Sequence, residues 1–256
     1  MTSVPPAGRT AVWSLFGALV LVQICFPLTS GDVRAGFTVT TVVLGYVLSV
    51  THAALTRGAR AAAALVATAT LGGFAVEALG VATGFPFGTY DYSGELGPKV
   101  AGVPLIIPLA WTWMAWPAWL AACRVFRAWP ARVALAAVGL AAWDLFLDPQ
   151  MVAEGYWIWD SPTPALPGVP GIPVGNYLGW LGFAVVLMAA LRVAAGPSAA
   201  VRGWDAPMLA LWLWTYASSV LAHAVFLGLP WSAVWGGVVM GAAVLPLVIV
   251  LRRSRA

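Results

Sequence analysis

The chain has 256 residues, of which 61% are hydrophobic and 9% are charged, and its 13 Lys and Arg outnumber its 9 Asp and Glu to give a net charge of +4. Soluble domains carry roughly 25% charged residues, so this composition excludes an ordinary soluble protein. No basic cluster is interleaved with aromatic residues, which argues against nucleic-acid binding. We predict a single all-α integral membrane domain over residues 1–256.

Eight apolar segments approach the length of about 20 residues that a helix needs to cross a bilayer. Gly, Pro and charged residues separate them. Two of the separating segments, 84–102 and 150–174, are longer and rich in Gly, Pro and aromatic residues. The sequence therefore predicts a polytopic bundle of about eight transmembrane helices at 11–29, 36–56, 61–83, 103–123, 132–149, 175–194, 206–228 and 231–251.

The basic residues predict how this bundle is oriented. With eight spans, 11 of the 13 basic residues fall on the face that holds both termini, and only Arg34 and Lys99 fall on the other face. Cytoplasmic loops are the ones enriched in Lys and Arg. We expect both termini in the cytoplasm, both long loops outside, and a location in the cell membrane. Cys25 and Cys123 then lie near opposite faces, so we expect no disulfide.

Glu77 is the first acidic residue inside a predicted span. It shares a helix face with Gly73, Gly80 and Gly84, a stripe of small residues that allows a close approach. Ionisable residues inside a membrane are costly and usually functional, and a water-poor position favours a neutral carboxylic acid that can act as a general acid. The alternative is that Glu77 only bonds a backbone carbonyl or an arginine between helices.

The fifth span contains two further acids, Asp144 and Asp148, spaced i, i+4 on one helix face. Two carboxylates in this arrangement can bind a metal, share a proton or position a water. Pro149 is expected to end the helix just after Asp148, and the alternative role of Asp148 is only to close that helix end.

The two long loops resemble each other. FGTYDY (87–92) and EGYWIWD (154–160) share a Gly-x-aromatic-x-aromatic pattern, and the offset of 67 residues that aligns them also carries Glu77 onto Asp144. We predict a degenerate parallel repeat with a site between its halves. The alternative is that Gly and aromatic residues are simply common at membrane interfaces.

Several other polar residues are candidates for this site. Asp91 adjoins the aromatic pair of the first loop, although a solvated loop carboxylate is the simpler reading. Asn176 begins the sixth span, where it either orients a water or caps the helix. His223 follows Tyr216 and Ser219 at i+7 and i+4 on the seventh span, as part of a proton relay or of an interhelical hydrogen bond. His52 is expected to be structural.

The absence of several motifs limits the classes of reaction that the protein could catalyse. The chain has two distant histidines, no paired-aspartate motif, no dinucleotide fingerprint and no P-loop. We expect no metal site and no cofactor. What remains is proton transfer: an acid protonates an alkene, aromatic faces stabilise the tertiary cation, and a second carboxylate accepts a proton from the attacking water. Glu77 or Asp144 is the expected acid, and Asp148 or Asp91 the expected base.

Five segments resemble one family: EALGVATGFPFGTYDY (77–92), GVPLIIPLAW (102–111), WDLFLDP (143–149), EGYWIW (154–159) and GIPVGNYLGW (171–180). They are similar to the membrane-bound carotenoid biosynthesis hydratases over a signature core of 77–180. The resemblance implies that water adds to the terminal C1′=C2′ double bond of a linear carotenoid, without a cofactor. Other enzymes of carotenoid biosynthesis are candidate partners. The residues expected to line the cation site are Tyr90, Tyr92, Trp157 and Trp159.

Other functions stay open at this point. A non-enzymatic carotenoid or lipid carrier, or a proton-coupled transporter, also needs an apolar cavity with buried acids. An end-group cyclase also begins by protonating an alkene, so the acids alone do not separate cyclisation from hydration.

Overall fold

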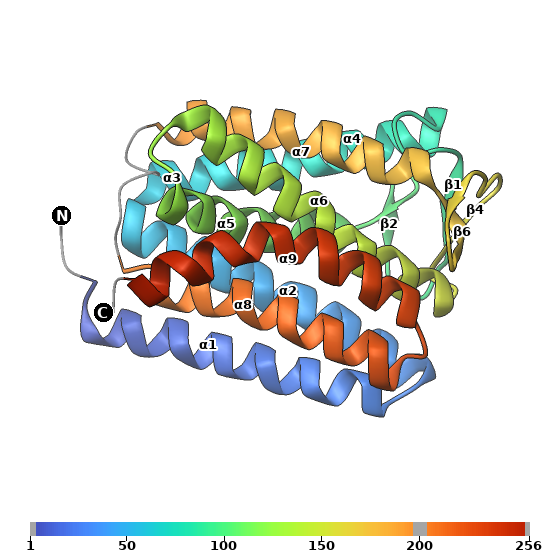
Figure 1. Cartoon of the computed structure of the whole chain (residues 1–256), viewed down its shortest axis with the longest axis horizontal. Helices are drawn as coiled ribbons and strands as arrows, with labels where there is room; N and C mark the ends of the chain where they lie inside the picture. Colours follow the sequence, from blue (N-terminus) through green and yellow to red (C-terminus); the bar gives the residue numbers. More distant parts are fainter. Residues whose placement is uncertain (1–3, 197–203, 254–256) are drawn as a thin grey trace.

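The computed structural model describes residues 4–196 and 204–253, and their helices form one bundle (Figure 1). The predicted all-α fold is confirmed. The helical elements are α1 (Pro6–Cys25), η1 (Phe26–Leu28), α2 (Gly31–Arg57), α3 (Ala59–Leu65), η2 (Val66–Leu71), α4 (Gly72–Thr83), α5 (Ile107–Val125), α6 (Trp129–Ala153), α7 (Val174–Ala195), α8 (Ala206–Leu221), η4 (Ala222–Phe226) and α9 (Pro230–Arg253). Of these, α3, η2 and α4 follow one another without a break and make the third predicted span.

Seven helical segments of the described residues are long and apolar enough to cross a membrane, and they correspond to seven of the eight predicted spans. The protein is thus a multi-pass membrane protein. The remaining predicted span is α5, whose Trp, Thr and Pro residues lower its hydropathy. This helix contacts α2, α6, α8 and α9, and nearly all of its side chains are buried. A helix that other helices surround does not need the apolar surface that lipid requires.

The start of α1 and the end of α9 lie at the same end of the bundle, as eight crossings require (Figure 1). At this end, Arg57 pairs with Asp205 at 2.6 Å and joins α2 to α8. At the opposite end, Arg34 pairs with Glu154. Arg202 and Arg255, which contributed to the predicted orientation, lie outside the described residues. Cys25 and Cys123 are both free.

Three short antiparallel ribbons cover the end of the bundle opposite to the start of α1 (Figure 1). They pair β1 (Tyr90–Tyr92) with β4 (Trp157–Trp159), β2 (Lys99–Val100) with β3 (Val103–Pro104), and β5 (Ala165–Leu166) with β6 (Val169–Pro173). The first ribbon joins the two long loops, with Tyr90 opposite Trp159 and Tyr92 opposite Trp157. The two segments that share a motif therefore lie side by side.

The predicted helix end at Pro149 is wrong, because α6 continues to Ala153. A proline inside a helix has no N–H for the carbonyl four residues earlier, which here belongs to Leu145. Ser232 of α9 supplies the missing donor, with its Oγ 2.6 Å from that carbonyl oxygen. A neighbouring helix can thus keep a proline-containing helix regular inside a membrane.

Pro117 in α5 is accommodated in the same way. Its missing N–H leaves the carbonyl of Trp113 without the usual helical donor. Ser49 of α2 donates to that oxygen at 3.0 Å.

Candidate active site

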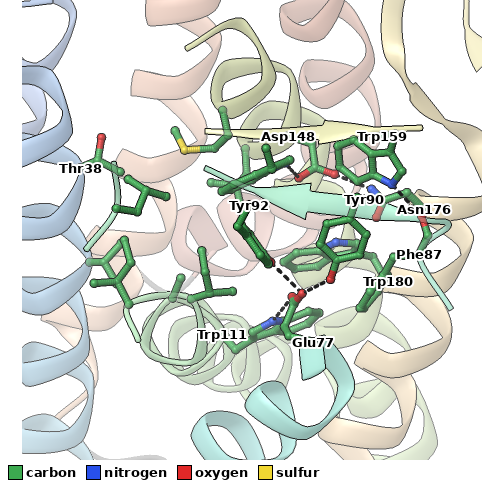
Figure 2. Close-up of a pocket in the computed structure, with 18 residues that line it drawn as sticks. Thr38, Glu77, Phe87, Tyr90, Tyr92, Trp111, Asp148, Trp159, Asn176 and Trp180 are labelled. Carbon is green, nitrogen blue, oxygen red and sulfur yellow. Dashed lines mark hydrogen bonds between the residues drawn. The ribbon is translucent and has the colours of Figure 1, made fainter. Parts of the chain in front are cut away.

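A cavity lies at the ribbon end of the bundle, beneath the β1–β4 ribbon (Figure 2). Its walls come from α2, α4, α5, α6 and α7. Most of the lining is aromatic or aliphatic, and two carboxyl groups face into it, those of Glu77 and Asp148. The other predicted site residues that line it are Tyr90, Tyr92, Trp157, Trp159 and Asn176.

Glu77 is buried on α4 and accepts hydrogen bonds from three side chains. The hydroxyl groups of Tyr90 and Tyr92 donate to Oε2 at 2.5 and 2.8 Å. The indole of Trp111 donates to Oε1 at 3.0 Å. Both carboxyl oxygens are therefore fixed by aromatic donors, as Figure 2 shows, and not by an arginine or a backbone carbonyl.

The glycine stripe beside Glu77 makes room for these aromatic donors. A Cβ atom on Gly73 would lie 2.8 Å from Cδ1 of Trp111, and one on Gly80 would lie 2.9 Å from the hydroxyl oxygen of Tyr90. Both separations are too short for ordinary contact. The predicted close approach along this stripe is thus an approach of rings to a helix.

Asn176 bridges the two aspartates of α6. Its Nδ2 donates to Oδ2 of Asp144 at 2.9 Å and also to Oδ2 of Asp148. Trp157 donates from the ribbon to Oδ1 of Asp148 at 3.2 Å. Because Asn176 lies inside α7, whose N-cap is Pro173, its predicted alternative role as a helix cap is wrong.

The two aspartates occupy different positions relative to the cavity. Both carboxyl groups accept from the same Nδ2 of Asn176. Asp148 lines the cavity, whereas Asp144 is fully buried and does not. The cavity therefore presents Glu77 from α4 and Asp148 from α6, with Asp144 behind the second acid.

Successive side chains of the β1–β4 ribbon point to opposite faces of the ribbon. Tyr90, Tyr92, Trp157 and Trp159 are buried on the face toward the cavity, whereas Asp91 is exposed on the other face. Alternation is the rule for a strand, so the structure does not bring Asp91 into the site. Burial and the neighbouring carboxyl group of Glu77 raise the pKa of both tyrosines, so they remain hydrogen-bond donors.

His223 does not join this cavity. It lies in η4, with Nδ1 2.8 Å from the carbonyl oxygen of Ser219 and Nε2 3.0 Å from that of Phe146 on α6. This is the interhelical contact that the sequence left as an alternative to a proton relay. His52 is likewise held between helices, because Trp116 donates to its Nδ1 at 3.0 Å.

Sequence reasoning missed Trp111 and Trp180, which both line the cavity. Their indole rings stack with centroids 3.8 Å apart and planes inclined by 16°. A signal was present, because each tryptophan is the last residue of one of two similar motifs, GVPLIIPLAW and GIPVGNYLGW. Tryptophan in an apolar span otherwise gives no indication of a role.

The chain is similar to proteins of carotenoid synthesis. A family model described as carotenoid biosynthesis protein matches residues 37–248. The chain is also 39% identical over 129 residues to the bisanhydrobacterioruberin hydratase of Haloarcula japonica. That match covers 48% of this chain and 41% of the relative, so the chain spans less than half the length of the relative. No solved structure matches the chain.

Proposed function

The protein belongs to the carotenoid biosynthesis protein family, and on this premise we propose that it hydrates the end of an acyclic carotenoid. Water adds across the terminal C1′=C2′ double bond and gives a tertiary alcohol. The name of the Haloarcula relative, a hydratase, supports this reaction. The proposed site is the cavity beneath the β1–β4 ribbon, in the outer half of the cell membrane.

The single observation that carries the proposal is the pair of buried carboxyl groups, Glu77 and Asp148, in one aromatic cavity. Hydration of an alkene needs one group to give a proton and one to take a proton from water. An apolar end group fits the aromatic and aliphatic walls, and the reaction requires no cofactor.

We assign the acid to the aspartate pair. Two carboxylates beside each other in an apolar environment repel, so the pair favours holding one proton between its members. Asp148 is the member that faces the cavity and would protonate C2′. Asp144 and Asn176 would act by positioning Asp148 and its proton.

We assign the base to Glu77. Three donors point at its two oxygens, an arrangement that fits an ionised carboxylate. An anion here would also stabilise the tertiary cation formed at C1′. When water attacks the cation, Glu77 would accept the released proton.

Aromatic side chains of the ribbon would also stabilise the cation. The rings of Tyr90 and Trp159 lie 5.5 Å apart, and those of Tyr92 and Trp157 lie 5.4 Å apart, across the ribbon. Faces of such rings attract cations. The ribbon would therefore cover the reacting end group and limit access of bulk water.

The test is expression in cells that accumulate lycopene, followed by mass analysis of the pigments. We expect carotenoids heavier by one or two water molecules. A ring-containing product of unchanged mass would instead identify a cyclase. Unchanged lycopene, in cells that contain the folded protein, would contradict the proposed enzymatic function and favour a carrier.

A further inference from the structure

A second cavity lies beside the cavity of the acids at the same end of the bundle. It is bounded by α1, η1, α2, α5, α6, α8 and η4. In contrast to the first cavity, its lining residues include no carboxyl group, and its polar side chains are amides, hydroxyls, indoles and an imidazole. These include Gln23, Thr41, Gln150, Thr215, Ser218 and His223.

Three of the residues that line this cavity have a buried polar atom without a hydrogen-bond partner among the described residues. The atoms are Nε1 of Trp113, Oγ1 of Thr215 and Oγ1 of Thr41. Trp113 and Thr215 are only 4% and 2% exposed. Buried polar groups are almost always bonded to protein or to ordered water, and water occupies cavities that are polar and large enough. A hydrocarbon chain in this place would leave all three atoms unbonded.

A thin partition separates the two cavities. The residues that line both are Thr38 and Val42 of α2 and Leu147 and Met151 of α6. Thr38 is the only one of these with a polar side chain. Its hydroxyl donates to the carbonyl of Arg34 at 3.0 Å, which leaves the oxygen able to accept a hydrogen bond from water.

Thr38 also marks one side of the first cavity. Figure 2 shows it at the edge of the first cavity, on the side away from Asn176 and Trp159. Water that passes Thr38 therefore enters the first cavity from the side opposite to these two residues.

We propose that the second cavity is a hydrated chamber that supplies the attacking water past Thr38. The inference rests on the proposed hydratase function. In this step the water oxygen forms a bond to the cationic C1′, and one water proton passes to Glu77. The proton that Asp148 gave to C2′ remains there, and the proton that Glu77 accepts returns to the aspartate pair before the next turnover, so water is the only co-reactant.

Two matched pairs of variants test the chamber. Thr38→Val removes the hydroxyl of the partition, and Thr40→Val removes the same kind of i, i−4 hydrogen bond from the exposed face of α2. Ser218→Leu fills the chamber, whereas Ala217→Leu adds the same bulk to the exposed face of α8.

The measurement compares two reactions of the cation, capture by water and loss of a proton. Membranes that contain the full chain are given lycopene in D₂O. Protonation delivers a deuteron to C2′, and water then captures the cation. A cation that is not captured loses a proton and returns to the alkene, which can retain deuterium. The ratio of deuterium in recovered lycopene to hydrated product therefore rises when water is scarce.

We expect this ratio to rise about fivefold in Thr38→Val and Ser218→Leu, the effect of one lost hydrogen bond to the water. Thr40→Val and Ala217→Leu should leave it unchanged, and Thr38→Ser should restore it. Simple damage to the fold lowers both products together and does not raise the ratio.

Two results would overturn the chamber. An unchanged ratio in both cavity variants, with a wild-type protein that hydrates lycopene, would refute the chamber and leave the hydratase function standing. A wild-type protein that forms neither hydrated nor deuterated carotenoid would refute both proposals.

Discussion

The indole rings of Trp111 and Trp180 stack with their centroids 3.8 Å apart. The two residues occupy the same position in two similar motifs, and the stack joins α5 to α7. Trp111 also donates to Glu77, and Trp180 lies in the same cavity wall. The stack thus connects the helix that orients one acid to the helix whose Asn176 holds the aspartate pair.

The two tryptophans are expected to differ in their effect on activity. Trp111→Phe keeps an aromatic ring in the stack but removes the N–H that donates to Glu77. A hydrogen bond to a charged group contributes about 1.5–3 kcal/mol, so kcat should fall by about ten- to a hundredfold. Trp180→Phe keeps every hydrogen bond of Glu77, and its kcat should fall less. Equal losses of kcat in the two variants would show that the N–H has no special role.

The proposed acid and base can be separated by the same deuterium measurement. Asp148→Asn removes the proton donor, so both hydration and deuterium uptake into lycopene should be lost. Glu77→Gln still allows the cation to form, so hydration should be lost while deuterium uptake continues. Loss of hydration alone in Asp148→Asn, and of both reactions in Glu77→Gln, would show that Glu77 is the acid and Asp148 the base. Asp91→Asn should keep full activity because its side chain lies on the exposed face of the ribbon.

The spans and the acids within them could be predicted because hydropathy and intramembrane charge are local properties of the sequence. Which of the acids face the cavity could not be predicted. The sequence suggested Glu77 or Asp144 as the acid and Asp148 or Asp91 as the base. In the structure Asp148 faces the cavity, and Asp144 is buried behind it. One helix turn separates the two residues and both bond to Asn176, so their spacing does not indicate which of them faces the cavity.

The orientation of Asp91 could have been predicted from the sequence if the strand had been recognised. Tyr90 and Tyr92 were expected to face the site, and strict alternation along a strand then places Asp91 on the opposite face. The strand itself was not predicted, because the three residues pair only with a segment 67 residues further on. Pairing between distant segments leaves no local pattern in so short a strand.

Alkaline pH should destabilise the fold through the tyrosines of the ribbon. Burial raises the pKa of Tyr90 and Tyr92 above the ordinary value. In the unfolded chain they ionise near pH 10, so above that pH the native state binds more protons than the unfolded state. The free energy of unfolding should therefore fall as pH rises.

The double variant Tyr90→Phe/Tyr92→Phe removes both titrating groups. Its free energy of unfolding should depend less steeply on pH between about pH 9 and 11 than that of the wild type. Thermal unfolding in detergent at several pH values measures the two slopes. Identical slopes would show that these phenols ionise as freely in the folded protein as in the unfolded chain.

Ser232 and Pro149 should be energetically coupled, because the serine hydroxyl donates to the carbonyl that the proline leaves without a helical partner. Ser232→Ala leaves the buried carbonyl of Leu145 unsatisfied, which should destabilise the protein by about 1–3 kcal/mol. In a Pro149→Ala background the backbone N–H of residue 149 can bond that carbonyl, so the same serine substitution should cost much less. Thermal unfolding of the four proteins in detergent gives the coupling energy. If Ser232→Ala costs the same in both backgrounds, the serine does not compensate for the proline, and the continuation of α6 to Ala153 needs another cause.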